Sequence, residues 1–433
     1  MDRESAVAGR PDRTPLTGRG HPSPVGRWEI VALLWVAFFL NQADRQVFNV
    51  VLPLIRTDLQ ISDAALGAIA TTFTIVYGLL VPLSGWLGDV IDRRKVVVIS
   101  LLTFSTGTLL TGFASSFLLL LMYRGIATGA GEALYAPAAA SLIGEAHVKT
   151  RARALSLHQT ANYTGIVLGS LISGLTAQAL GWRAAFLIYG IAGLAWGIFL
   201  MWRLRGHQPL RDAAAAPKDW ATTRATVRDS LAVIAGTPTI IAHMIGFGGL
   251  IFVLVGFLTW TPTLLFERFG VPIAYAGFEA VVYHHIGAYA GLALTSWATD
   301  RLIGRWPRVR LLSMAFGLIG MVPFIWWAAS ASTAWQAYVA LGLFGFFRGI
   351  YDAGIFAAIF DVVEDRLRST VTGILLASGF LIGAASPSIM GAMKASYGLE
   401  GGMQVLSIAA LIAGMVLGIT TLLDRPNRAV GAL

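Results

Sequence analysis

The stretch GWLGDVIDRRK, residues 85–95, decides how this chain is organised. It places Asp89, Arg93 and Arg94 between two apolar runs, 66–88 and 96–115. About 20 consecutive apolar residues suffice to span a bilayer, and charged side chains are costly inside it. The stretch therefore predicts a short charged loop that joins two membrane helices.

The composition extends this expectation to the whole chain. Of its 433 residues, 56% are hydrophobic and only 13% are charged, whereas soluble domains carry about 25% charged residues. The hydropathy pattern predicts an all-α membrane protein with twelve transmembrane helices. The expected helices are 28–55, 66–88, 96–115, 117–143, 155–180, 184–204, 237–266, 275–298, 310–330, 335–362, 370–395 and 401–423.

An internal repeat divides these helices into two six-helix bundles. SWATDRLIGRW (296–306) follows the eighth expected helix as GWLGDVIDRRK follows the second, so that Asp300 matches Asp89. Such parallel repeats place a substrate site at their interface near the bilayer midplane. The expected organisation is a disordered tail 1–27, a bundle 28–204, a polar linker 205–230, a bundle 231–424 and a tail 425–433.

The basic residues predict the orientation. Of 32 Lys and Arg, 25 fall in the tails, the linker and alternate loops, four fall in the opposite loops, and three lie inside helices. By the positive-inside rule, both termini and the linker are expected to be cytoplasmic, in a cell inner membrane. The net charge of +9 is thus explained by the basic residues of the cytoplasmic loops and does not indicate nucleic-acid binding. The chain has no cysteine, which excludes disulfides and thiolate metal sites.

The 85–95 stretch resembles the G-x-x-x-D-x-x-x-R-[RK] loop signature of the major facilitator superfamily. The 6+6 helices and the degenerate second copy complete the resemblance. It implies alternating-access transport by a monomer, with Gly85, Asp89, Arg93, Arg94 and Asp300 acting in gating. No Walker loop or nucleophile elbow is present, so an ATPase or another enzyme is not expected.

A finer resemblance begins at NQADRQVFNVVLPLI (41–55) and continues at GEALYAPAAASLI (131–143). Both stretches resemble two subfamilies: anion:cation symporters, which carry sugar acids and other organic anions, and Spinster-like carriers of lysolipids. One departure is the spacing of Arg124 and Glu132. Eight residues place them about 80° apart on an α-helix, so either the helix bulges near TGAGE or the two side chains do not meet.

Ionisable residues inside membrane helices usually face a cavity and have partners. We hypothesise that Asp44 and Glu132 are proton-coupling carboxylates. Arg45 would alternate between them and an anionic substrate, because guanidinium binds carboxylates bidentately. Arg124 is assigned to the same group, although its place near the outer end of its helix also suits a gate or an interfacial contact. Arg348 and Asp352 share a helix face at i, i+4, which is equally consistent with a self-neutralising pair and with a substrate role.

Polar and aromatic residues on the helices are the candidates for substrate binding. His284 and His285 point about 100° apart, so at most one is expected to face the cavity. No His, Asp and Glu set has metal-ligand spacing, and no cofactor is expected. The expected substrate-binding residues are Arg45, Asn41, Gln42, Asn49, Tyr77, Tyr135, Gln159, Asn162, Tyr163, Trp260, Tyr283, His284 and Asp352.

These observations favour a proton-coupled symporter of an organic anion such as a hexuronate or aldonate. The alternative is a Spinster-like carrier or exporter of a lysolipid or amphiphilic drug. That carrier would have few hydrogen-bonding groups facing the cavity from helices five, seven and eight. A transporter-like sensor is a more remote alternative, because Asp44, Glu132 and the loop signature are all retained.

Overall fold

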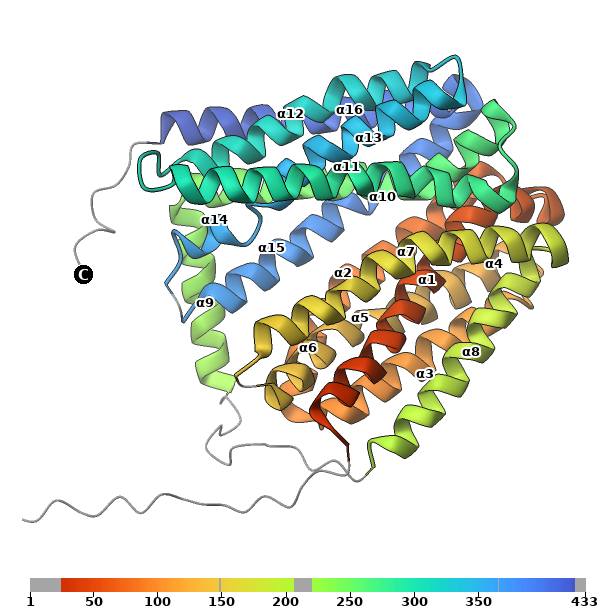
Figure 1. Ribbon diagram of the computed structural model, residues 1–433, viewed down its shortest axis with the longest axis horizontal. Helices are drawn as coiled ribbons and strands as arrows, with labels where there is room; N and C mark the ends of the chain where they lie inside the picture. Colours follow the sequence, from red (N-terminus) through yellow and green to blue (C-terminus); the bar gives the residue numbers. More distant parts are fainter. Residues whose placement is uncertain (1–24, 148, 206–219, 365, 425–433) are drawn as a thin grey trace, which may run out of the picture.

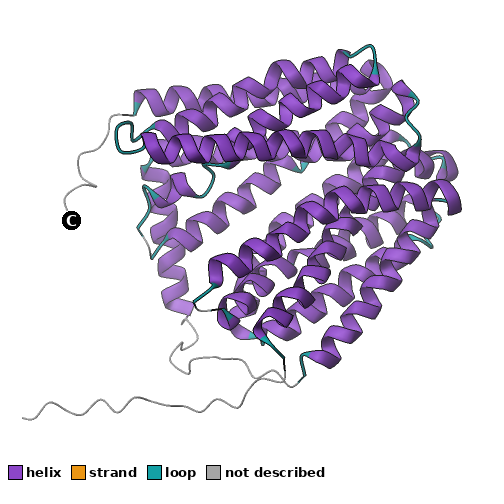
Figure 2. Ribbon diagram, in the orientation of Figure 1, coloured by secondary structure: helices purple, strands orange, loops and turns teal. Residues whose placement is uncertain are grey.

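The computed structural model describes residues 25–147, 149–205, 220–364 and 366–424. Within these ranges the chain folds into helices joined by short loops and forms no strand (Figure 2). Figure 1 shows two groups of helices, α1 to α8 and α10 to α16. We call the end of the bundle where α1 begins and α16 ends the termini end, and the opposite end the distal end.

Six expected helices build the first group. The fourth of them is continuous but changes its winding, from α4 through the π-helix η1 to α5 and α6. The observed bounds are α1 Arg27–Leu59, α2 Asp63–Val90, α3 Arg93–Thr111, α4 Phe117–Leu120, η1 Leu121–Thr128, α5 Gly129–Ala133, α6 Tyr135–Ala146, α7 Arg151–Leu180 and α8 Trp182–Arg203.

The second group repeats this plan after an additional helix. The bounds are α9 Trp220–Gly236, α10 Pro238–Phe269, α11 Ile273–Leu302, α12 Val309–Ser330, α13 Ala334–Asp352, α14 Ala357–Phe360, α15 Arg368–Gly383 and α16 Ala385–Leu423.

Two features differ from the sequence-based expectation. The polar stretch 205–230 was expected to be a linker, but its second half forms α9, which packs against α15 and α10; residues 206–219 lie outside the described residues. In addition, α16 contains the end of the eleventh expected helix and the whole twelfth. The chain turns between them at Gly398, whose φ of 64° suits a residue without a Cβ.

Nine spans in the described residues satisfy length and hydropathy criteria for crossing a membrane. One of them, Arg368–Leu423, covers 56 residues and therefore contains two of the expected helices. The long helices α1 and α11 are not among the nine, and α1 carries Asp44 and Arg45 in its middle. Together these elements account for the twelve expected helices of a multi-pass membrane protein.

Glycines bring α7 against α1, as the GIVLG pattern (165–169) predicts. A Cβ at Gly169 would lie 2.4 Å from Ala43 Cα, and one at Gly165 would lie 2.8 Å from Gln42 Cβ. This close contact fixes the part of α1 that carries Asp44 and Arg45.

The two halves meet mainly through α7 against α11 and α2 against α15 and α16. At the distal end, a cluster of charges ties them together. Lys394 of the second half lies 3.0 Å from Asp63 of the first, and Arg56 of the first lies 2.9 Å from Glu267 of the second. Lys394 also pairs with Glu267 at 2.9 Å. We call Arg56, Asp63, Glu267 and Lys394 the distal latch, because their ion pairs join the two halves at this end.

Replacing Lys394 with Gln should weaken the distal latch and shift the halves toward a state that is open at the distal end. Arg56 also contacts both acids, but Lys394 with Asp63 is one of the two pairs in the latch that cross between the halves. Each pair is worth about 1 kcal/mol at most, so a roughly fivefold population change is expected. The chain has no cysteine, so introduced cysteine pairs can carry spin labels across the two distal ends. The distance distribution should gain a longer component.

The matched control is Arg183→Gln, because Arg183 pairs with Asp58 at the same end but within one half. This variant should leave the distances unchanged. An unchanged distribution in Lys394→Gln would show that the latch does not hold the distal end closed.

Candidate functional site

The candidate site is a cavity of about 270 Å³ between the two halves. The wall from the first half is rich in polar and charged groups and includes Arg45 and Arg124. The wall from the second half is mostly apolar and contains one charged residue, Arg348. The lining residues are Gln42, Arg45, Gln46, Phe48, Asn49, Ala70, Phe73, Thr74, Tyr77, Arg124, Asn162, Ile166, Ile251, Leu254, Val255, Leu258, Thr259, Arg348 and Phe380.

Helix α1 supplies a polar face to this cavity because residues three and four positions apart lie on one side of a helix. Gln42, Arg45, Gln46 and Asn49 follow this spacing and all line the cavity. Asp44 is one residue from Arg45, about 100° around the helix, and points instead into the first half, where it is 2% exposed. Asp44 and Arg45 are therefore adjacent in the sequence but face different surroundings, Arg45 the cavity and Asp44 the interior of the first half.

Arg45 is held by Glu132 of α5. Its Nε and Nη2 donate to Glu132 Oε2 at 2.9 and 2.6 Å. The guanidinium also lies over the ring of Tyr77, at 4.6 Å from its centroid, and over Phe73 at 5.2 Å. Aromatic faces attract such cations, so Arg45 is positioned at the cavity surface between an acid and two rings.

Arg124 connects the two buried acids. Its Nη1 lies 3.7 Å from Asp44 Oδ2 and 3.9 Å from Glu132 Oε1, and its Nη2 donates to the Arg45 carbonyl oxygen at 3.1 Å. Thr108 of α3 donates to Asp44 Oδ2 at 2.6 Å. We call Asp44, Arg45, Arg124 and Glu132 the charge quartet; it pairs two acids with two bases.

The spacing of Arg124 and Glu132 is explained by the π-helix η1. Leu121–Thr128 closes its hydrogen bonds to residue i+5, so each turn contains one more residue than an α-helical turn. This absorbs the eighth residue and returns Glu132 to the side of Arg124. Of the two alternatives left open by the sequence, the helix bulge is the one found, although it lies just before TGAGE.

One oxygen of each acid accepts no hydrogen bond. Asp44 Oδ1 and Glu132 Oε1 are buried without a hydrogen-bond partner among the described residues. A buried acceptor without a donor is unfavourable by about 1–3 kcal/mol. The arrangement therefore leaves a place on each carboxylate where a proton can be bound.

Several expected substrate-binding residues do line the cavity, namely Gln42, Arg45, Asn49, Tyr77 and Asn162. Others are placed elsewhere by the helix periodicity. Asn41 accepts a hydrogen bond from Gln42, Tyr135 donates to the Leu34 carbonyl oxygen, and Gln159 is exposed at the surface of the bundle.

The expected residues of the second half, and Tyr163 of the first half, are also displaced from the cavity. Trp260 donates to the Pro387 carbonyl oxygen, and His284 is buried between Phe257 and Phe344. Tyr163 of α7 packs against His285 and Tyr289. Asp352 is not among the lining residues, and it lies 3.0 Å from Arg348 Nε.

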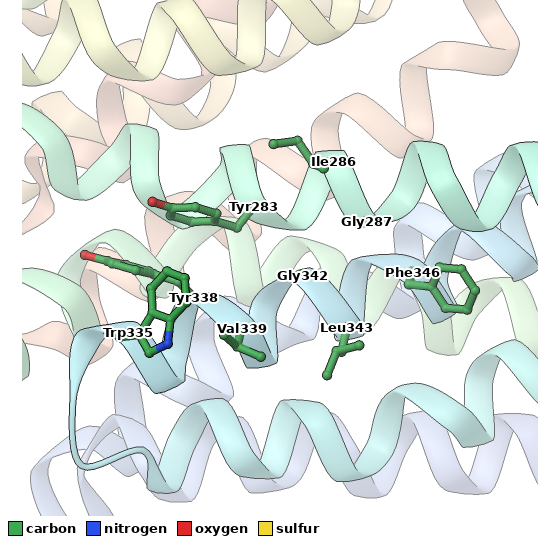
Figure 3. A pocket seen from close by; sticks show the side chains of 9 residues that line it. All are labelled: Tyr283, Ile286, Gly287, Trp335, Tyr338, Val339, Gly342, Leu343 and Phe346. Atoms are coloured by element: carbon green, nitrogen blue, oxygen red, sulfur yellow. The ribbon is translucent and has the colours of Figure 1, made fainter.

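Tyr283 lines a different hollow, a groove of about 390 Å³ between α11 and α13 (Figure 3). Trp335 and Ile286 in this groove are 69% and 63% exposed, so the groove opens on the outer surface of the bundle. Glycines at positions 287 and 342 allow the two helices to approach there. Tyr283 therefore does not contribute to the central cavity.

The expected gating residues lie at the termini end. Arg93 donates to Glu145, and Arg94 pairs with Asp92, which holds the pKa of Asp92 below its ordinary value. In the second half, Asp300 lies 3.5 Å from Arg310, which also pairs with Asp361. Gly85 has no side chain, and the side chain of Asp89 lies outside the described residues.

Sequence reasoning missed Gln46, Thr74 and Thr108. Gln46 has a signal, since it falls on the α1 face of Gln42 and Asn49. Thr74 and Thr108 have none, because threonine is common in membrane helices and its partner depends on tertiary packing. The apolar residues that line the cavity from the second half likewise have no signal in the sequence, because apolar residues occur throughout membrane helices.

These features define a helical membrane protein with a charged central cavity between two repeated halves. The sequence profile of the Major Facilitator Superfamily matches residues 34–387. The chain belongs to this superfamily, whose members and the relatives below are transporters rather than enzymes. It is therefore a membrane transporter of small molecules.

Two relatives represent the two resemblances seen in the sequence. The probable L-galactonate transporter of Escherichia coli is 25% identical over 83% of this chain and 81% of its own length. Protein spinster homolog 1 of Xenopus laevis is 28% identical over 84% of this chain and 72% of its own. A solved bacterial homologue of the human lysosomal transporter Spinster, in an inward-facing and unoccupied conformation, has a TM-score of 0.78. It shares 20% identity over 92% of this chain and 97% of its own.

Replacing Thr108 with Val should destabilise the protein, because Asp44 loses the one hydrogen bond that its carboxylate accepts among the described residues. The expected loss is about 1–3 kcal/mol, measured by thermal unfolding in detergent. In an Asp44→Asn background the same change should cost less, because the charge is gone.

Thr106→Val is the matched control, since Thr106 on the same helix is exposed and bonds only to the Leu102 carbonyl oxygen. Equal effects of Thr108→Val with and without the Asp44 carboxylate would contradict the coupling.

Proposed function

We propose that this chain couples the movement of an organic anion, such as a sugar acid, to protons by alternating access. The observation that carries the proposal is the charge quartet at the cavity surface. Arg45 and Arg124 line the cavity, and Glu132 and Asp44 lie behind them. Two cations at the cavity wall attract an anion, and two buried acids beside them can take up protons.

The coupling follows from competition for the same cations. When Glu132 and Asp44 are ionised, they neutralise Arg45 and Arg124. A proton on the oxygen of either acid that accepts no hydrogen bond removes that negative charge and leaves a guanidinium free to bind a substrate carboxylate bidentately. Substrate and proton then bind together, because each is more favourable when the other is present.

The distribution of Lys and Arg supports an orientation with both termini in the cytoplasm of the cell. The distal latch would then face outward, and the described state would be closed to the outside. Alternating access requires the latch to open and the termini end to close. Within each half, the pairs Arg93 with Glu145 and Arg310 with Asp361 bind helices together at that end.

A second candidate is a Spinster-like carrier of an amphiphilic anion, and one observation favours it. Helices α7, α10 and α11 supply only Asn162 and Thr259 as hydrogen-bonding groups to the cavity lining, while Ile251, Leu254 and Leu258 form an apolar wall. The volume favours the smaller solute. A cavity of about 270 Å³ lies below the range of about 300–1,000 Å³ usual for drug-sized ligands.

The proposal predicts internal acidification when a sugar acid is added outside proteoliposomes that contain the protein and a trapped pH dye. Galactonate and galacturonate are the first probes, with a lysolipid tested in parallel. Asp44→Asn should abolish acidification and uphill uptake while retaining exchange of labelled for unlabelled substrate, since Arg45 and Arg124 remain.

Asp58→Asn serves as the control, because Asp58 lies on the same helix and pairs with Arg183 at the distal surface. Uphill uptake by Asp44→Asn would refute the coupling role. A response to the lysolipid with none to any sugar acid would establish the second candidate instead.

We also propose that Asp89 acts in gating at the termini end. Replacing Asp89 with Ala should slow transport at least tenfold and leave equilibrium binding of galactonate within about threefold, because a gating residue of the loop signature affects the change of state rather than the substrate contacts. Transport assays and binding titrations of one purified sample separate the two effects. Asp300→Ala, at the repeated position, is the companion variant. Normal transport by Asp89→Ala would exclude a gating role.

A further inference from the structure

The cavity has a second cationic group on the wall opposite the charge quartet. Arg348 of α13 lines the cavity from the second half, whereas Arg45 and Arg124 line it from the first. We propose that the transported substrate is a compact dianion, with one acidic group at Arg45 and Arg124 and the other at Arg348. This inference rests on the proposed transport of an organic anion and specifies its class.

Arg348 is not saturated by its neighbour. Its Nε lies 3.0 Å from Asp352 Oδ2, but that contact lacks the alignment of a hydrogen bond, and Nε has no hydrogen-bond partner among the described residues. A guanidinium offers five N–H donors. Arg45, by comparison, directs two donors to Glu132. Arg348 therefore has more N–H donors available for a ligand than Arg45, which already directs two of its donors to Glu132.

The surroundings of Arg348 make this capacity significant. The rest of its wall consists of Ile251, Leu254, Val255, Leu258 and Phe380, together with one hydroxyl. That hydroxyl belongs to Thr259 and donates to the Val255 carbonyl oxygen. Asp352 offsets the charge of Arg348, but donors left unfilled in an apolar wall remain unfavourable until a further anion accepts hydrogen bonds from them. The side chain is 16% exposed, so such an anion would be largely removed from water.

Two cationic groups on opposite walls favour a ligand with two acidic ends. A monoacid would bind either Arg348 or the pair Arg45 and Arg124, and would leave the other cationic group without a substrate carboxylate. A cavity of about 270 Å³ limits the body between the acids to a small one. The ligand would also contact both halves at once, and these contacts would favour closure of the two halves around it.

Charge balance extends the inference to the protons. With Asp44, Glu132 and Asp352 all ionised, the three acids offset Arg45, Arg124 and Arg348. A bound dianion would add two negative charges to this balanced set. Two of the acids must then be protonated to restore neutrality, so two protons are expected to accompany each dianion.

The test compares galactarate with galactonate, which differ by one carboxylate in place of a hydroxymethyl group. Isothermal titration of the purified full-length protein should show at least tenfold tighter binding of galactarate. Arg348→Gln should remove that preference and leave galactonate binding within about threefold. Asp352→Asn should act in the opposite direction and tighten galactarate binding, because it removes the acid that competes for Arg348.

Arg183→Gln, at the distal surface, is the control for loss of an arginine. Equal weakening of both acids by Arg348→Gln, or an unchanged preference, overturns the dianion. So does weaker galactarate binding by Asp352→Asn, which would identify the pair as structural. If the wild-type protein binds both acids equally, the proposed transport of an organic anion is retained, but the proposal that the substrate is a dianion is refuted. If it binds neither acid, the proposed function itself fails.

Discussion

The structure depends on burying two acids and two bases together inside the first half. Each of these groups alone would be costly in the membrane, and the quartet of Asp44, Arg45, Arg124 and Glu132 offsets the charges within one cluster. The cluster joins α1, η1 and α5, and Thr108 attaches it to α3. The helices that must hold the substrate are thus positioned by the same groups that would bind protons and anion.

The second half follows a different design although its helices repeat those of the first. Its cavity wall is apolar except for Thr259 and Arg348, and His284 is buried between Phe257 and Phe344 rather than exposed to the cavity. The polar chemistry is therefore concentrated in one half, while the other supplies shape and one cation. Joining the halves at the distal latch creates a single cavity that neither half contains alone.

This asymmetry bears on the two functional candidates. An apolar wall would suit an amphiphile, but the small volume and the charged groups on both walls suit a compact anion. The relatives do not separate the candidates, since a probable sugar-acid transporter and a spinster homologue resemble the chain to a similar degree. Charge and volume within the cavity are the physical basis for preferring the anion.

The sequence by itself determined the twelve membrane helices, the two halves and the superfamily, because hydrophobic runs and a charged loop signature are local properties of the chain. It also singled out Asp44, Arg45 and Glu132 as charges within apolar helices, and their roles in coupling stay predictions. Only the tertiary structure decided which polar residues meet in the cavity. Tyr135, Trp260 and His284 look equivalent to Asn49 and Tyr77 in the sequence, but a rotation of about 100° per residue and the packing of neighbouring helices turn them elsewhere. The π-helix that brings Arg124 to Glu132 was likewise only one of two alternatives, because its extra residue is visible solely in the hydrogen bonds of the folded helix.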